Sequence, residues 1–166
     1  RVRDDGQGMG RADAGMALER HATSKLRSFD DLQSIATHGF RGEALPSIAS
    51  VSELVLRTRA EGDPAGTEVA VSHGRGLHVR DTGHPRGTTV EVRDLFGAVP
   101  ARRKFLRAAP TEAAHVAEAL TLLALARPGT GFSLKSGGRT LFEAPPVDGL
   151  AARLFQLFGA KLLEDL

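Results

Sequence analysis

Apolar and polar residues alternate along this chain with two different periods. A period of two, with β-branched residues at the apolar positions, predicts antiparallel strands at residues 53–59, 67–73, 76–81 and 88–96. Helix start and stop signals predict helices at residues 11–20, 28–36, 43–51, 110–127 and 148–159. Two adjacent glycines predict a hairpin over residues 132–144. A run of strands with helices grouped around it predicts an α+β sandwich, one sheet covered on one face.

The longest predicted helix, at residues 110–127, carries an apolar stripe. Val116, Leu120 and Leu123 recur at helical spacing, and Pro128 follows the last turn. We expect this stripe to belong to the core and not to a partner site.

Length and composition narrow the class of protein. With 166 residues, 41% of them apolar and 25% charged, the chain has the composition of an ordinary globular protein of one domain plus the start of another. The double proline at 145–146 predicts the boundary, with a first domain over 1–145 and a second beginning in 146–166. The chain has no initiator Met, so we expect it to be part of a longer protein.

Charge, cysteine and histidine usage exclude several kinds of site. The formal charge of +2 is too small to indicate nucleic-acid binding by itself. The absence of cysteine excludes disulfides and thiolate metal sites, and the six histidines lack the spacing of zinc ligands. No apolar run approaches the roughly 20 residues that span a bilayer. These features are typical of a cytoplasmic protein.

The stretch DDGQGM, at residues 4–9, places an acidic pair beside two alternating glycines at a strand end. Glycine lets the backbone approach a ligand closely, and the carboxylate of Asp4 offers an acceptor to a donor such as an exocyclic amine. Arg11 stands where a dinucleotide-binding fingerprint needs glycine, and the spacing of an EF-hand is missing. By itself the stretch is more typical of a simple strand-to-helix turn.

Two further stretches are rich in groups that bind phosphate. In THGFRGEAL, at residues 37–45, two glycines precede a helix start, where unpaired amides attract anions. The Lys-Ser/Thr pair of a P-loop is absent from it. In RHATSKL, at residues 20–26, a threonine, a serine and a lysine are adjacent. Each stretch has a structural alternative, as helix caps or as a polar loop.

Taken in order, five motifs resemble one family. DDGQGM, RHATSK, GFRGEAL, GTTVEV and LFGAVPARRKFL closely resemble the successive nucleotide-binding motifs of the MutL family of DNA mismatch repair proteins. That family shares its ATPase fold with gyrase B, a heat-shock chaperone and histidine kinases. The resemblance covers residues 1 to about 145 and implies a two-layer α/β sandwich of that type, followed by the start of a second α/β domain.

The resemblance also implies roles for individual residues. Asp4 matches the residue that binds the adenine amino group, Gly6 and Gly8 admit the base, and Thr88 supports the aspartate and an ordered water. The phosphate loop corresponds to Gly39, Phe40, Arg41, Gly42, Glu43, Ala44 and Leu45. Part of a lid over ATP corresponds to Thr23, Ser24 and Lys25.

The chain departs from the family pattern at two places. The family's helix with the general-base Glu and the magnesium-binding Asn lies upstream of residue 1, so no catalytic or metal residue is assigned and the chain is expected to be inactive alone. Gly97, Ala98 and Val99 stand where the family usually has Asn in LFxNxPAR. The cofactors that the resemblance implies are ATP and Mg²⁺.

The densest basic run follows the second departure and consists of Arg102, Arg103, Lys104 and Arg107. By itself such a run is compatible with a solvated face. The resemblance implies sequence-independent contact with DNA, the mismatch-recognition protein MutS and other repair factors as partners, a homodimer, and a bacterial, nucleoid-associated location. Two alternatives remain: another ATPase of the superfamily, such as a type II topoisomerase subunit, and a DNA-binding module with purely structural glycine turns.

Overall fold

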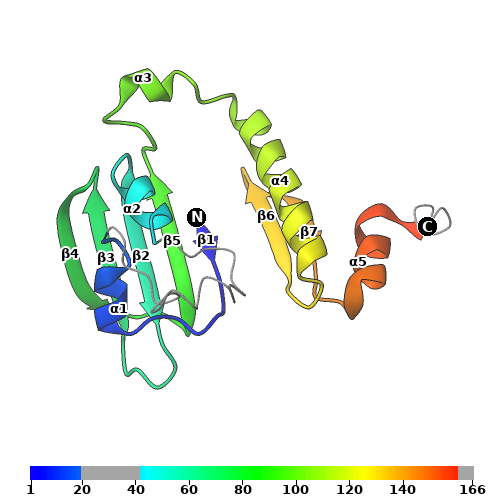
Figure 1. Ribbon diagram of the computed structural model, residues 1–166, viewed down its shortest axis with the longest axis horizontal. Coiled ribbons are helices and arrows are strands. Elements are labelled where there is room, and N and C mark those ends of the chain that lie inside the picture. Colours follow the sequence, from blue (N-terminus) through cyan, green and yellow to red (C-terminus); the bar gives the residue numbers. More distant parts are fainter. Residues whose placement is uncertain (20–41, 161–166) are drawn as a thin grey trace, which may run out of the picture. The chain divides into compact units, whose positions relative to one another are not determined.

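The computed structural model describes residues 1–19 and 42–160. It divides into two compact units, Arg1–Phe105 and Leu106–Leu166, which Figure 1 shows along one chain. The expected domain boundary at 145–146 concerns the whole protein and stays a prediction. The helix expected at residues 28–36 lies outside the described residues.

The first unit contains one antiparallel sheet of five strands in the order β1-β5-β2-β3-β4. Its strands are β1 (Val2–Arg3), β2 (Glu53–Arg59), β3 (Gly66–Ser72), β4 (Arg75–Thr82) and β5 (Gly87–Arg93). All four strands predicted from the period of two are present, and β1 adds a short edge strand. The predicted strand 88–96 ends early because Asp94 and Phe96 adopt positive φ angles of 45° and 63°.

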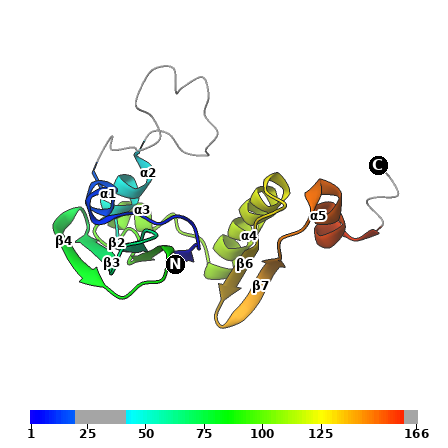
Figure 2. The ribbon, with the colours of Figure 1, turned by 90° about the horizontal axis from the view of Figure 1, so that it is seen from below.

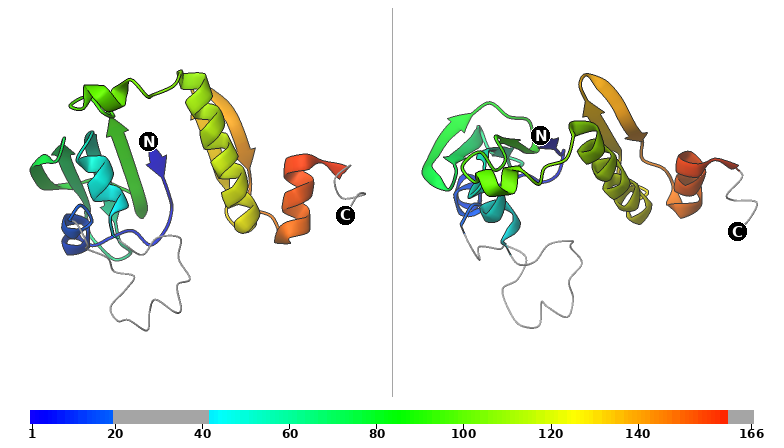
Figure 3. Two further views of the ribbon diagram at one scale, coloured as in Figure 1. Left: turned by 45° about the horizontal axis from the view of Figure 1, so that its top comes forward. Right: turned by 90° about the horizontal axis from the view of Figure 1, so that it is seen from above.

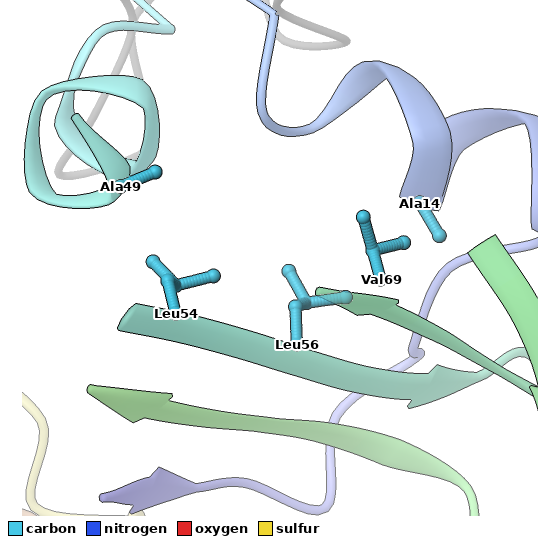
Figure 4. Close-up of a cluster of buried hydrophobic side chains, with 5 residues drawn as sticks. All are labelled: Ala14, Ala49, Leu54, Leu56 and Val69. Carbon is cyan, nitrogen blue, oxygen red and sulfur yellow. The ribbon is translucent and has the colours of Figure 1, made fainter. Parts of the chain in front are cut away.

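Helices cover one face of this sheet. They are α1 (Arg11–Met16) and α2 (Ala44–Ala49), while α3 (Pro100–Arg103) follows the last strand. Figures 2 and 3 show α1 and α2 on the same side of the strands. The buried cluster between these layers consists of Ala14, Ala49, Leu54, Leu56 and Val69, which are drawn in Figure 4. The predicted α+β sandwich with one covered face is therefore confirmed.

The opposite face of the sheet carries charged side chains in ion pairs. The carboxylate of Glu68 accepts hydrogen bonds from Arg57 and from Arg80, each at 2.6 Å. Glu68 is only 5% exposed. Burial raises the pKa of Glu68, but the two guanidinium groups outweigh it and hold the pKa below its ordinary value. The charged form of this glutamate therefore cross-links β2, β3 and β4.

The second unit packs one long helix on a hairpin. Its elements are α4 (Ala109–Ala126), β6 (Phe132–Ser136), β7 (Arg139–Ala144) and α5 (Gly149–Phe158). The buried guanidinium of Arg153 donates to the carbonyl oxygens of Pro128, Thr130 and Pro145, which fastens α5 to the ends of the hairpin. Among the described helices, none is long and apolar enough to cross a membrane.

The apolar stripe of α4 differs from the expectation. Val116 and Leu123 are 46% and 39% exposed, so the stripe is not buried within this unit. A two-stranded hairpin is too narrow to cover a helix of 18 residues, and Ala124 is the one residue of α4 that is fully buried.

Candidate functional site

A row of polar residues crosses the sheet at the end of the hydrophobic core. Thr58 of β2 pairs directly with Thr88 of β5 and with Thr67 of β3. Asp4 lies opposite Thr88, because its amide donates to the Thr88 carbonyl at 2.9 Å and extends the β1–β5 pairing by one residue. Residues two apart along a strand share a face, so this row lies on the same side as Leu56 and faces the helices.

The carboxylate of Asp4 is oriented by the backbone. Its Oδ1 accepts the amide of Gly6 at 3.0 Å and the amide of Thr88 at 3.1 Å. Its Oδ2 has no hydrogen-bond partner among the described residues, and the residue is exposed. One oxygen therefore fixes the side chain, and the other is an accessible acceptor.

Thr58 connects the three segments that meet here. Its hydroxyl accepts the amide of Met9 at 2.9 Å, donates to the carbonyl oxygen of Gly87 at 3.1 Å and lies 3.0 Å from the hydroxyl of Thr88. The residue is completely buried. Thr58 was not among the residues predicted for the site. Its position in ELVLRTR offers a signal, because the alternation places it on the apolar face, where a polar residue needs hydrogen-bond partners.

Close backbone packing explains the glycines around Asp4. Gly8 has φ +70°, and a Cβ atom there would lie 1.9 Å from the carbonyl oxygen of Arg59. Gly87 has φ +110°, and its Cβ would lie 2.3 Å from the carbonyl oxygen of Asp4. Neither position accepts a side chain without moving backbone atoms. The glycine loop, residues 6–10, therefore lies directly against the end of β2, and the start of β5 lies against Asp4, the residue after β1.

The structure describes only the last part of the predicted phosphate loop. Gly42 has φ +64°, Glu43 precedes α2, and Ala44 and Leu45 form its first turn. Leu45 packs against the hydrophobic cluster, which anchors this helix start to the core. The remaining predicted phosphate and lid residues lie outside the described residues: Gly39, Phe40, Arg41, Thr23, Ser24 and Lys25.

The basic run is exposed, and it is divided between the two units. Arg102, Arg103 and Lys104 belong to the first unit and Arg107 to the second. The guanidinium of Arg103 lies 3.5 Å from the carboxylate of Asp94, and that of Arg107 lies 2.7 Å from the His115 ring. Arg102 and Lys104 show no ion pair within the described part of the chain, which leaves two basic side chains available at α3.

The turn that contains the departure from the family motif, at Gly97, Ala98 and Val99, has a local geometry of its own. A Cβ atom at Gly97 would lie 1.7 Å from the carboxylate of Asp94, so a side chain at this position would require the Asp94 side chain to move. The amide of Phe96 donates to the Val51 carbonyl at 2.7 Å, which holds the turn against the segment after α2. Backbone hydrogen bonds thus close this turn in the absence of the usual Asn.

Comparison with known proteins gives consistent results. No protein family model matches the chain. It is 55% identical to the DNA mismatch repair protein MutL of Opitutus terrae over all 166 residues, and 59% identical over 159 residues to that of an Anaeromyxobacter species. It spans 26% of the length of each of these curated relatives, about a quarter.

Solved structures show the same relationship. The MutL ATPase domain of Aquifex aeolicus, in complex with ADP, matches with a TM-score of 0.72 at 34% identity. The match covers 95% of this chain and 55% of that domain. The sequence identity and the similarity of fold agree, and the chain therefore belongs to the MutL family, with the fold of its ATPase domain.

Proposed function

We propose that this chain forms the adenine-binding part of an ATPase that acts in DNA mismatch repair in the bacterial cytoplasm, at the nucleoid. In the whole protein, ATP binding and hydrolysis would control closure of a homodimer and its contacts with DNA, MutS and other repair factors. The observation that carries the proposal is the Asp4 carboxylate, with Oδ1 fixed by two amides and Oδ2 accessible.

This arrangement fits adenine better than guanine. An ionised carboxylate only accepts hydrogen bonds, so Oδ2 of Asp4 fits the exocyclic amino group of adenine. Guanine presents a carbonyl oxygen at the corresponding position, and two acceptors repel. We assign to Gly6 and Gly8, which lack side chains, the role of admitting the base, and the amide of Thr88 holds the carboxylate from the strand opposite.

The remaining part of the proposed site would bind the phosphates. We assign this role to the loop before α2, residues 39–45, because amides at a helix start and a glycine at positive φ suit an anion. Thr23, Ser24 and Lys25 would belong to the lid. Bound Mg²⁺-ATP would supply the phosphoryl group and the charge of its phosphates. The described residues are assigned to the base and the phosphates, and none of them is assigned to the cation.

The test is a substitution that removes the acceptor charge. Asp4→Asn in the full-length protein should weaken ATP binding by at least tenfold, because a hydrogen bond to a carboxylate is roughly twice as strong as one to a neutral amide. The matched control is Asp5→Asn, the same change at the adjacent exposed position, where no side-chain hydrogen bond to the described residues is present. Isothermal titration with ATP measures both. An Asp4→Asn dissociation constant within twofold of the wild-type value would refute the assignment.

The same titration addresses the alternatives. A DNA-binding module with structural glycine turns would show no ATP affinity in the wild type. Another ATPase of the superfamily would bind ATP but would not restore mismatch repair in cells that lack MutL. We expect the protein to restore it, and to lose that activity with Asp4→Asn.

A further inference from the structure

We propose that Thr58 is a positioning residue that sets the direction of hydrogen bonding at the base site and thereby its preference for adenine over guanine. This inference rests on the proposed nucleotide function. Thr58 itself is buried and contacts Asp4 only through Thr88 and the glycine loop.

The hydrogen-bonding capacity of the Thr58 hydroxyl is fully used. A hydroxyl has one proton to donate and two lone pairs that accept. The proton goes to the carbonyl oxygen of Gly87, which can only accept, and one lone pair receives the amide of Met9, which can only donate. The contact with Thr88 must then use the second lone pair, so Thr88 is its donor.

This assignment leaves Thr88 without a proton for a ligand. Its hydroxyl proton points to Thr58, and its oxygen keeps lone pairs that can only accept. Asp4, directly opposite on the neighbouring strand, also offers only acceptors. Two facing acceptors match an amino group, which carries two protons, and disfavour a carbonyl oxygen. Because of Thr58, the Thr88 hydroxyl can only accept a hydrogen bond from a ligand, as the Asp4 carboxylate does.

Thr58 also fixes the glycine loop. The amide of Met9 follows Gly8, whose backbone already lies against Arg59, and its hydrogen bond to Thr58 completes the attachment of the loop to β2. Loss of the hydroxyl would leave this partly buried amide without its acceptor, at a cost of about 1 kcal/mol or more. The loop that carries Asp4 would then be less well ordered.

The experiment compares four full-length proteins: wild type, Thr58→Val, Thr58→Ser and Thr67→Val. Valine keeps the shape of threonine without its hydroxyl, and serine keeps the hydroxyl. Thr67 is the matched control, because it is 4% exposed, lies in the same row on β3 and shows no side-chain hydrogen bond in the described part of the chain. Dissociation constants for ATP and GTP are measured for each protein.

We expect Thr58→Val to reduce the ratio of ATP to GTP affinity by about tenfold, since the Thr88 proton becomes available to the guanine carbonyl. Thr58→Ser and Thr67→Val should keep the wild-type ratio. A purely structural role would lower both affinities together and leave the ratio unchanged. Amide hydrogen exchange at Met9 in the nucleotide-free protein should accelerate in Thr58→Val and not in Thr67→Val.

The outcomes separate this inference from the proposed function. Absence of ATP binding by the wild type would overturn both. Wild-type binding with a Thr58→Val ratio within twofold of normal would overturn the role of Thr58 alone. If Thr58→Val does not fold, Thr58→Cys replaces it, because a thiol of similar size forms only weak hydrogen bonds, and the same ratio decides the matter.

Discussion

Gly8 offers a test of whether the glycine loop packs as described. In Gly8→Ala, the new Cβ would lie 1.9 Å from the carbonyl oxygen of Arg59, and this neighbour is backbone that cannot rotate away. A side chain at φ +70° costs about 1 to 2 kcal/mol, and displacement of the loop removes the hydrogen bond from Met9 to Thr58, worth about 1 kcal/mol. The free energy of unfolding should therefore fall by about 2 to 3 kcal/mol.

Gly15→Ala is a control for which we expect the opposite change in the free energy of unfolding. It lies in α1, and a Cβ there meets no atom within 4 Å. Gly15→Ala should therefore raise the free energy of unfolding by about 0.5 kcal/mol, because alanine loses less conformational entropy in a helix. Urea denaturation followed by circular dichroism gives both differences, and titration with ATP should show weaker binding for Gly8→Ala alone. Equal stability of the two variants would refute the described packing of the loop against β2.

Two further predictions concern charged residues. Arg102 and Lys104 are the basic residues at α3 that form no ion pair with the described residues, and the double variant Arg102→Glu with Lys104→Glu should weaken binding to unrelated DNA duplexes and lower the salt slope by roughly 0.9 per lost contact, with ATP affinity unchanged. The control reverses the charges of Lys135 and Arg139, and equal effects of the two double variants would contradict a specific DNA role. Glu68→Gln should reduce the free energy of unfolding by about 2 kcal/mol near neutral pH. The folded state lowers the pKa of the Glu68 carboxyl, so its contribution to the free energy of unfolding is complete above the unfolded-state pKa of about 4.3. This contribution disappears as the pH falls through the folded-state pKa. Urea midpoints of wild type and Glu68→Gln that differ equally at pH 3 and pH 7 would contradict this prediction.

The sequence predicted the strands well because burial on one face imposes a strict alternation. ELVLRTR and GTTVEVR repeat apolar residues at every second position, and both became central strands of the sheet. The prediction for α4 was weaker, since a helical stripe shows which residues share a face but not what covers that face. Val116 illustrates this, because it lies on the stripe and is 46% exposed.

The sequence motifs selected residues of the candidate site but not the connections between them. Asp4, Gly8 and Thr88 were selected from short motifs, and the structure brings them together at the ends of three neighbouring strands. That proximity depends on the β1–β5 and β2–β5 pairings, which join residues more than 25 positions apart. Local periodicity carries no information on such pairings, and for this reason the link through Thr58 was missed.

The hydrogen bond between the glycine loop and Thr58 is important because the loop is only weakly buried. Every residue from 1 to 7 is exposed, so the loop gains little stability from apolar contacts. Its position depends on a few hydrogen bonds, each worth about 1 kcal/mol, that lead to a buried threonine at the end of the core. A ligand that bonds to Asp4 adds to the same network, so binding and local order of the loop should stabilise each other. We therefore expect the proposed site to lose its geometry when the buried hydroxyl of Thr58 is removed, even though this hydroxyl would not contact the ligand.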